Sequence, residues 1–184
     1  MTATSFDSAR AVRFDLPRGT VQAAGMDERL VLVPCSALDD LVLSVSPEAV
    51  EALGMSIGAA IGTRAAARVS DMQSASVEEF VTQLAGEAAI AGIGSLSVER
   101  WGRALVVVLD RSPLASAWLC PVVASALQAA CGRKVATLLL SRDADSARVL
   151  VSSERGVGRV GDWVASGVAW GDALARLHMG GTRG

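Results

Sequence analysis

Three glycines at every fourth position constrain the segment between Pro47 and Arg68. Gly54, Gly58 and Gly62 interrupt a pattern that otherwise strongly favours a helix, and their spacing places all three on one helix face. Each glycine costs about 0.5–1 kcal/mol relative to alanine in a helix interior. The stripe therefore indicates that something approaches this helix closely. Three interpretations are open: packing within the subunit, packing across a dimer axis, or a gap that holds an apolar ligand.

If a ligand fills such a gap, we expect it to touch both this helix and a second apolar helix further along the chain. The ligand-binding residues predicted on this basis are Gly58, Ile61, Trp118 and Val122. A closed apolar pocket among them would favour ligand binding, whereas a filled core with an exposed apolar patch would favour a scaffold. Trp101 could line the same gap, but tryptophan is also a frequent core residue.

The length of 184 residues fits one domain, because a chain of this size buries about 70% of its unfolded surface without disulfides or metals. We expect a disordered N-terminus over residues 1–10, a single α+β domain over 11–178 and a flexible tail over 179–184. The mean hydropathy of +0.41 is high, but prolines and serines interrupt the uncharged stretch between Arg111 and Arg133. We interpret that stretch as a buried helix and, with no signal peptide visible, expect a cytoplasmic protein without a membrane span.

Charge and cysteine content argue against two further classes of protein. The 17 basic and 19 acidic residues are spread along the chain, which has one lysine, Lys134, so we expect no nucleic-acid partner. Cys35, Cys120 and Cys131 are odd in number and include no C-x-x-C pair. We expect them to be reduced and buried, and we expect no metal site.

Hydrophobic periodicity and turn residues predict the elements. Residues 11–16 and 29–33 form an expected hairpin, with a turn at 17–19, and a short helix follows at 36–43. From there the predicted order is helix, helix, hairpin, helix, hairpin, helix, at residues 47–68, 76–91, 95–110, 113–131, 134–153 and 162–178. Pro121 fits its helix only in the first turn. This order favours an α+β fold with helices packed on one face of an antiparallel sheet.

No residues form a recognisable catalytic constellation. Residues 156–161 (GVGRVG) match G-x-G-x-x-G, but a dinucleotide site also needs a second parallel strand and a ribose-binding acid, and neither is expected before Gly184. We interpret this segment as a plain loop. His178 is the one histidine and is expected at a solvated helix end. We therefore expect no catalytic residues, no cofactor and no enzymatic activity.

Three short motifs carry a resemblance to a known family. The succession of Gly92–Gly94, a hairpin, Asp110–Leu114 (DRSPL), an apolar helix, Gly132–Val135 (GRKV) and a last hairpin resembles the 4-vinyl reductase domain over about Pro47 to Val151. That family includes a protein of bacteriochlorophyll synthesis, sensory domains of aromatic-responsive regulators and TRAPP subunits. The resemblance implies an α/β fold that dimerises and often encloses an apolar cavity.

The sequence also departs from that family. Some members bind zinc through cysteines at the start of the long helix and around the final hairpin. Here Cys120 alone lies near the first place, and the last hairpin has none, so the resemblance implies no metal site in this chain.

Together these observations predict a non-enzymatic homodimeric module. It would bind a small apolar ligand or act as an assembly or regulatory partner, as the resemblance to the 4-vinyl reductase domain implies. The order helix, hairpin, helix, hairpin, helix is also similar to that of roadblock-type proteins. The alternative hypothesis is therefore a roadblock-like dimeric scaffold for a small GTPase or another protein.

Overall fold

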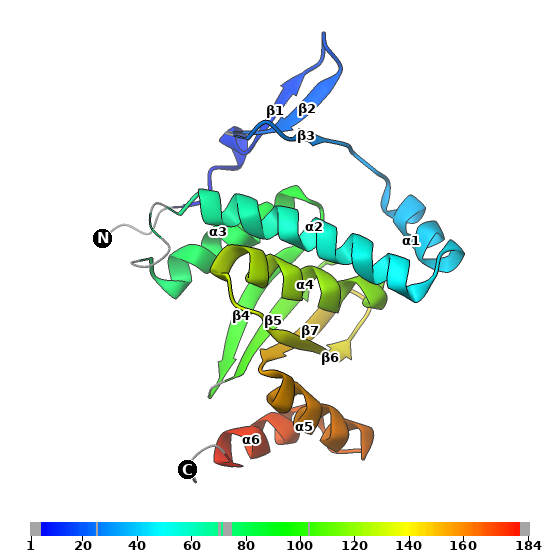
Figure 1. The fold of residues 1–184 in the computed structure, drawn as a ribbon, viewed down its shortest axis with the longest axis vertical. Coiled ribbons are helices and arrows are strands. Elements are labelled where there is room, and N and C mark those ends of the chain that lie inside the picture. The colour runs from blue at the N-terminus through cyan, green and yellow to red at the C-terminus, as the bar shows by residue number, and fades with distance from the viewer. Residues whose placement is uncertain (1–4, 25, 70, 72–74, 103, 181–184) are drawn as a thin grey trace.

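The computed structural model describes residues 5–24, 26–69, 71, 75–102 and 104–180. Its centre is a four-stranded antiparallel sheet with the strand order β4-β5-β7-β6 (Figure 1). The strands are β4 (Ser95–Trp101), β5 (Ala104–Asp110), β6 (Ala136–Arg142) and β7 (Ser146–Ser152). Both predicted hairpins are therefore confirmed, and their second strands, β5 and β7, pair with each other in the middle of the sheet.

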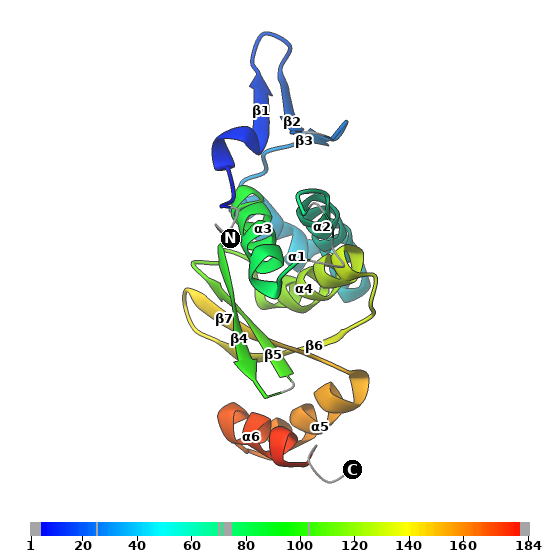
Figure 2. The same ribbon diagram turned by 90° about the vertical axis from the view of Figure 1, so that its left-hand side faces the viewer.

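Helices cover both faces of this sheet (Figure 2). On one face lie α3 (Val77–Ile90) and α4 (Ser116–Cys131), with α2 (Pro47–Ala67) packed on them; on the other lie α5 (Glu154–Ala165) and α6 (Trp170–Gly180). The expected single α+β domain is confirmed. The helices α2 to α4 lie on one face of the sheet, as expected, but α5 and α6 lie on the other. The strand β5 explains this: its residues Val107 and Val106 belong to apolar cores on opposite faces of the sheet, so helices must shield both faces from water.

Serine residues begin three of these helices. Ser46, Ser76 and Ser153 each accept a hydrogen bond from the backbone N–H three positions later, at 3.3, 3.0 and 3.2 Å. Such a bond satisfies one of the N–H groups that a helix start leaves without a partner. These serines are therefore the N-caps of α2, α3 and α5.

The glycine stripe of α2 packs against α4 within the subunit. A Cβ atom on Gly58 would collide with the carbonyl oxygen of Val122, and one on Gly62 would collide with that of Ala126. The two helix backbones therefore touch along the stripe. This confirms the first interpretation of the stripe and shows that the other two, a dimer axis and a ligand gap at the glycines, are wrong.

Pro121 lies in the second turn of α4, which begins at Ser116, so the prediction that it would occupy the first turn is wrong. The helix α4 tolerates this proline for a local reason. Proline lacks the N–H of a helical hydrogen bond and its ring needs space, and Gly54 provides that space: a Cβ there would lie 3.0 Å from the Cβ of Pro121.

The segment interpreted as a glycine loop, residues 156–161, lies inside α5, and the expected helix over 162–178 is divided into α5 and α6. The division falls near Gly167, whose φ of +90° suits glycine best. The helix forms because Val157, Val160 and Val164 share one face and pack on the sheet. Tertiary burial therefore outweighs the low helix propensity of the glycines.

In the N-terminal part, the small sheet projects from the main body, whereas the following helix packs apolar side chains against the main core (Figure 1). This part consists of a 3-10 helix (Ser8–Arg10), a sheet of β1 (Val12–Asp15), β2 (Thr20–Ala23) and β3 (Arg29–Leu30), and α1 (Cys35–Ser44). The predicted turn at residues 17–19 is present, but β1 pairs with β2 rather than with residues 29–33. Ser8–Arg10 is helical within a range expected to be disordered, whereas residues 1–4 and 181–184 lie outside the described residues.

Candidate ligand-binding site

The four residues predicted to bind a ligand fall into two pairs. Gly58 is covered by the backbone of α4, and Trp118 is fully buried where α4 crosses α2 near Gly54. These two residues serve helix packing, so the prediction that Gly58 borders a ligand gap is wrong. Ile61 and Val122 do face a common space, an apolar cavity next to the stripe. The indole N–H of Trp118 has no hydrogen-bond partner among the described residues.

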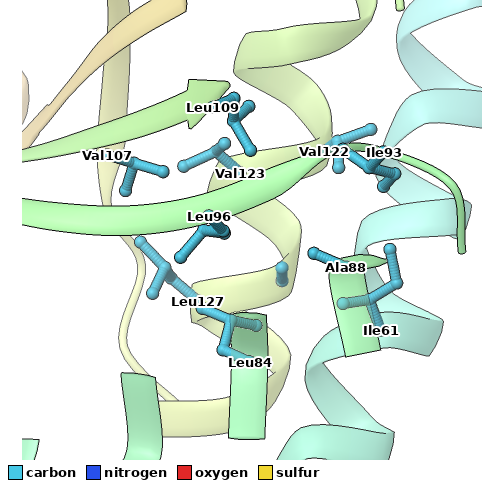
Figure 3. A pocket seen from close by; sticks show the side chains of 11 residues that line it. Ile61, Leu84, Ala88, Ile93, Leu96, Val107, Leu109, Val122, Val123 and Leu127 are labelled. Atoms are coloured by element: carbon cyan, nitrogen blue, oxygen red, sulfur yellow. The ribbon is translucent and has the colours of Figure 1, made fainter. Parts of the chain in front are cut away.

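This space, which we call the inner cavity, lies between α2, α3, α4 and the first two strands of the central sheet. Figure 3 shows side chains of all five elements pointing into it. All eleven lining residues are apolar: Ile61, Leu84, Ala88, Ile93, Leu96, Val107, Leu109, Val122, Val123, Ala126 and Leu127. Its volume is about 20 Å³, whereas an apolar cavity that admits benzene measures about 150 Å³. In this conformation the inner cavity is too small for an aromatic ring.

A much larger space, the outer groove, opens between α3, the C-terminal end of α4 and the sheet. Its volume is about 750 Å³, within the range of about 300–1,000 Å³ typical of small-molecule sites. Its lining residues come from both helices, from β4, β5 and β7, and from the loop after α4: Val77, Phe80, Val81, Leu84, Val98, Leu105, Val107, Leu127, Ala130, Cys131, Arg133, Val135 and Val151. We take it as the candidate ligand-binding site.

The inner cavity and the outer groove share part of their walls. Leu84 of α3, Val107 of β5 and Leu127 of α4 line both spaces. Leu84 and Val107 are 2% exposed, while Leu127 is half-buried. The two spaces are therefore adjacent and are bordered by the same three side chains.

The sequence missed the groove, although part of its signal was visible. Val77, Phe80, Val81 and Leu84 follow the i, i+3, i+4, i+7 pattern of an apolar helix face. In the structure Phe80 and Leu84 belong to the buried core and also line the groove, whereas Val77 remains 46% exposed. Periodicity identifies an apolar face, but it does not say whether side chains or an open space lie opposite.

Two of the lining residues are not hydrocarbon, Cys131 and Arg133, and both are exposed, so we place them at the mouth of the groove. Burial raises the pKa of the Cys131 thiol, and the charge of Arg133 acts in the opposite direction. A raised pKa keeps the thiol protonated near neutral pH, so Cys131 is a weak nucleophile. The mouth therefore combines a neutral sulfur with one positive charge.

The three cysteines are free, but Cys35 and Cys131 are exposed, so the expectation that all three are buried is wrong. Over the part of the chain that the structure describes, no three His, Cys, Asp or Glu residues lie close enough to hold a metal ion. His178 is exposed near the end of α6, beside the turn at Gly102. The same described residues contain no helix long and apolar enough to cross a membrane.

A buried ion-pair network lies on another side of α3. The carboxylate of Glu87, 1% exposed, accepts hydrogen bonds from Arg64 at 2.7 Å and Arg68 at 2.5 Å. Arg64 also pairs with Glu28 at 3.1 Å, and Arg68 lies 4.9 Å from the ring centre of Phe6. The network joins α2 to α3 and to the N-terminal part, and none of its residues lines the groove.

No family model matches the sequence, and no curated protein matches it either. Among solved structures, the chain is similar to the crystal structure of the phenol-responsive sensory domain of the transcription activator PoxR with phenol. The two share 16% sequence identity and a TM-score of 0.59, and the likeness covers 92% of each chain. At this identity the likeness establishes a shared fold. The resemblances to the 4-vinyl reductase domain and to roadblock-type proteins stay predictions.

Proposed function

We propose that this protein is a non-enzymatic module that binds a small apolar molecule in the outer groove. The observation that carries the proposal is an opening of about 750 Å³ with almost entirely apolar walls. Transfer of apolar surface out of water contributes about 25 cal/mol per Å², and water in such a groove finds few hydrogen-bond partners. An apolar ligand would release that water and fill the gap between α3 and α4.

The shared fold supports this proposal. The similar structure is a sensory domain with a small aromatic molecule, phenol, so the architecture is compatible with a ligand-responsive role. In the present chain a ligand in the groove would press on Leu84 and Leu127, which also line the inner cavity. Because α4 contacts α2 directly along the glycine stripe, occupancy would be transmitted to α2.

Binding of a neutral fluorescent probe, N-phenyl-1-naphthylamine, tests the proposal. We expect saturable binding to the wild-type chain and loss of binding in Val81→Trp, because the indole would occupy the groove. Thr82→Trp is the matched control, since Thr82 neighbours Val81 without lining the groove. Absence of saturable binding to the wild type, or equal binding by both variants, would contradict a ligand site in this groove.

We further propose that the protein is a homodimer assembled through its N-terminal part. Five large apolar residues there are strongly exposed: Phe14 at 58%, Leu16 at 81%, Val31 at 83%, Leu32 at 74% and Leu43 at 86%. Exposed apolar surface of this kind is typical of an interaction site, and two-fold homodimers are the commonest assemblies. This observation supports an assembly role alongside ligand binding.

The remaining expectations are part of the same proposal. A roadblock-like scaffold was expected to have a filled core, so the open groove favours ligand binding over that alternative. We propose a cytoplasmic location, supported by three free cysteines, because reducing compartments keep thiols unpaired. We propose no nucleic-acid partner, in line with the net charge of −2.

A further inference from the structure

We infer that the ligand of the outer groove carries a carboxylate, and that Arg133 binds this head group at the mouth while an apolar body fills the groove. The ligand class is therefore that of amphipathic carboxylic acids, such as medium-chain fatty acids. The inference rests on the ligand-binding function proposed above and specifies its chemistry.

The composition of the lining is the first argument. Eleven of the thirteen lining residues are aliphatic or aromatic, the twelfth is Cys131, and the thirteenth, Arg133, is the one charged residue among them. A site for a wholly apolar molecule has no need of a charge, whereas a site for an amphipathic anion needs one cation at one end. Arg133 lies in the loop after α4, at the mouth of the groove, where a head group would remain in contact with water.

The guanidinium of Arg133 has no carboxylate partner among the described residues, so it is free to bind a ligand. No carboxylate among the described residues lies within 4 Å of its guanidinium. The adjacent cation, Lys134, instead pairs with Glu154 at 3.0 Å and does not line the groove. Two neighbouring cations thus have different environments, one neutralised and one open to a ligand.

Other charges lie near the groove but do not line it. Glu78 and Glu79 are in the first turn of α3, but neither lines the groove. The C-terminal carbonyls of α4 carry a partial negative charge of about half a unit, and Gly132 satisfies one of them through its bond to Gln128. The full charge of Arg133 exceeds that partial charge, so an anionic group in direct contact with Arg133 is attracted.

The chemistry of the side chain fits a carboxylate. A guanidinium presents two parallel N–H donors to the two oxygens of a carboxylate, which an ammonium does not. Because both groups stay at the exposed mouth, neither pays the large desolvation penalty of a buried ion pair. Most of the affinity would come from the apolar body, and the ion pair would fix the orientation of the ligand.

Calorimetric titration of the full chain with decanoate and with 1-decanol tests this inference, since the two ligands share a chain and differ in head group. We expect Arg133→Gln to weaken decanoate binding about fivefold, the effect of an exposed ion pair, and to leave decanol binding unchanged. Lys134→Gln, which removes the same unit of charge from the neighbouring residue, should change neither. Raising the salt concentration should weaken decanoate binding alone.

The outcomes separate this inference from the proposed function. If wild-type protein binds both ligands and Arg133→Gln affects both equally or neither, the carboxylate assignment is wrong while the apolar site stands. Equal weakening of decanoate by Lys134→Gln and Arg133→Gln would also overturn the assignment, because the effect would then be one of net charge. If neither ligand binds the wild-type chain saturably, both the inference and the proposed function fail.

Discussion

At the scale of single residues, Gly58 approaches α4 so closely that a side chain on it would collide with that helix. Its missing side chain allows contact with the Val122 carbonyl and the Ser125 hydroxyl. This carbonyl belongs to the backbone of α4, so it cannot move aside without distorting that helix. The absence of a Cβ at Gly58 is therefore a packing requirement.

We expect Gly58→Leu to lower the free energy of unfolding by about 2 kcal/mol or more. Overpacking costs roughly 1–3 kcal/mol and is worst against backbone, while the gain in helix propensity is about 0.8 kcal/mol. Denaturant midpoints would measure the change. Ala59→Leu is the control, because Ala59 is a half-buried neighbour, and it should change the free energy of unfolding little. A Gly58→Leu variant more stable than the wild type would contradict the packing of α2 against α4.

At the scale of elements, Glu87 joins α3 to α2. Its carboxylate binds both Arg64 and Arg68, and Arg64 is itself 7% exposed. Buried charges are tolerated only when they are paired. The two helices are thus held by a charged contact in addition to the apolar core.

Replacing Glu87 by Gln should destabilise the protein by about 3–5 kcal/mol, because two arginines would lose their shared counter-charge in a buried position. Chemical denaturation would report the loss. Glu28→Gln provides the comparison: its side chain is 42% exposed, so the effect should stay below about 1 kcal/mol. Equal losses of stability in the two variants would mean that burial does not determine how much each ion pair contributes to the free energy of unfolding.

At the scale of the whole molecule, the N-terminal part has little core of its own. Ala11 and Ala23 are its fully buried residues among those described, and both are small. Several of its larger apolar side chains, including Val31 and Leu32, face solvent, whereas those of α1 that are half-buried pack on the main core. A second copy of the chain would give the exposed side chains the burial that the main body does not.

Native mass spectrometry of the wild-type chain should therefore show a dimer, and Val31→Asp with Leu32→Asp should shift it to monomer, because charges placed in an apolar interface lose hydration without a partner. Asp39→Asn, an exposed change on α1, is the control and should leave the dimer intact. A wild-type monomer at micromolar concentration would contradict the assembly.

The elements were largely predictable because their signals are local. Ser46 and Ser76 mark helix starts, Gly132 marks a helix end with its φ of +67°, and alternation followed by Gly102 marks a hairpin. Each depends on hydrogen bonds or sterics within a few residues. Helix 154–165 escaped prediction because its glycines favour a loop locally, while the burial of Val160 against the sheet decides the outcome.

The residues alone predict an α+β domain with an antiparallel sheet, the two hairpins of that sheet and a helix with a close-packed glycine face. Which partner packs against that face depends on long-range contacts, and it is α4 rather than a ligand or a second subunit. Of the predicted site, Ile61 and Val122 reached the inner cavity, whereas the outer groove draws its walls from residues between Val77 and Val151. A space of that kind arises from the separation of elements distant in the chain, and no local pattern of residues encodes that separation.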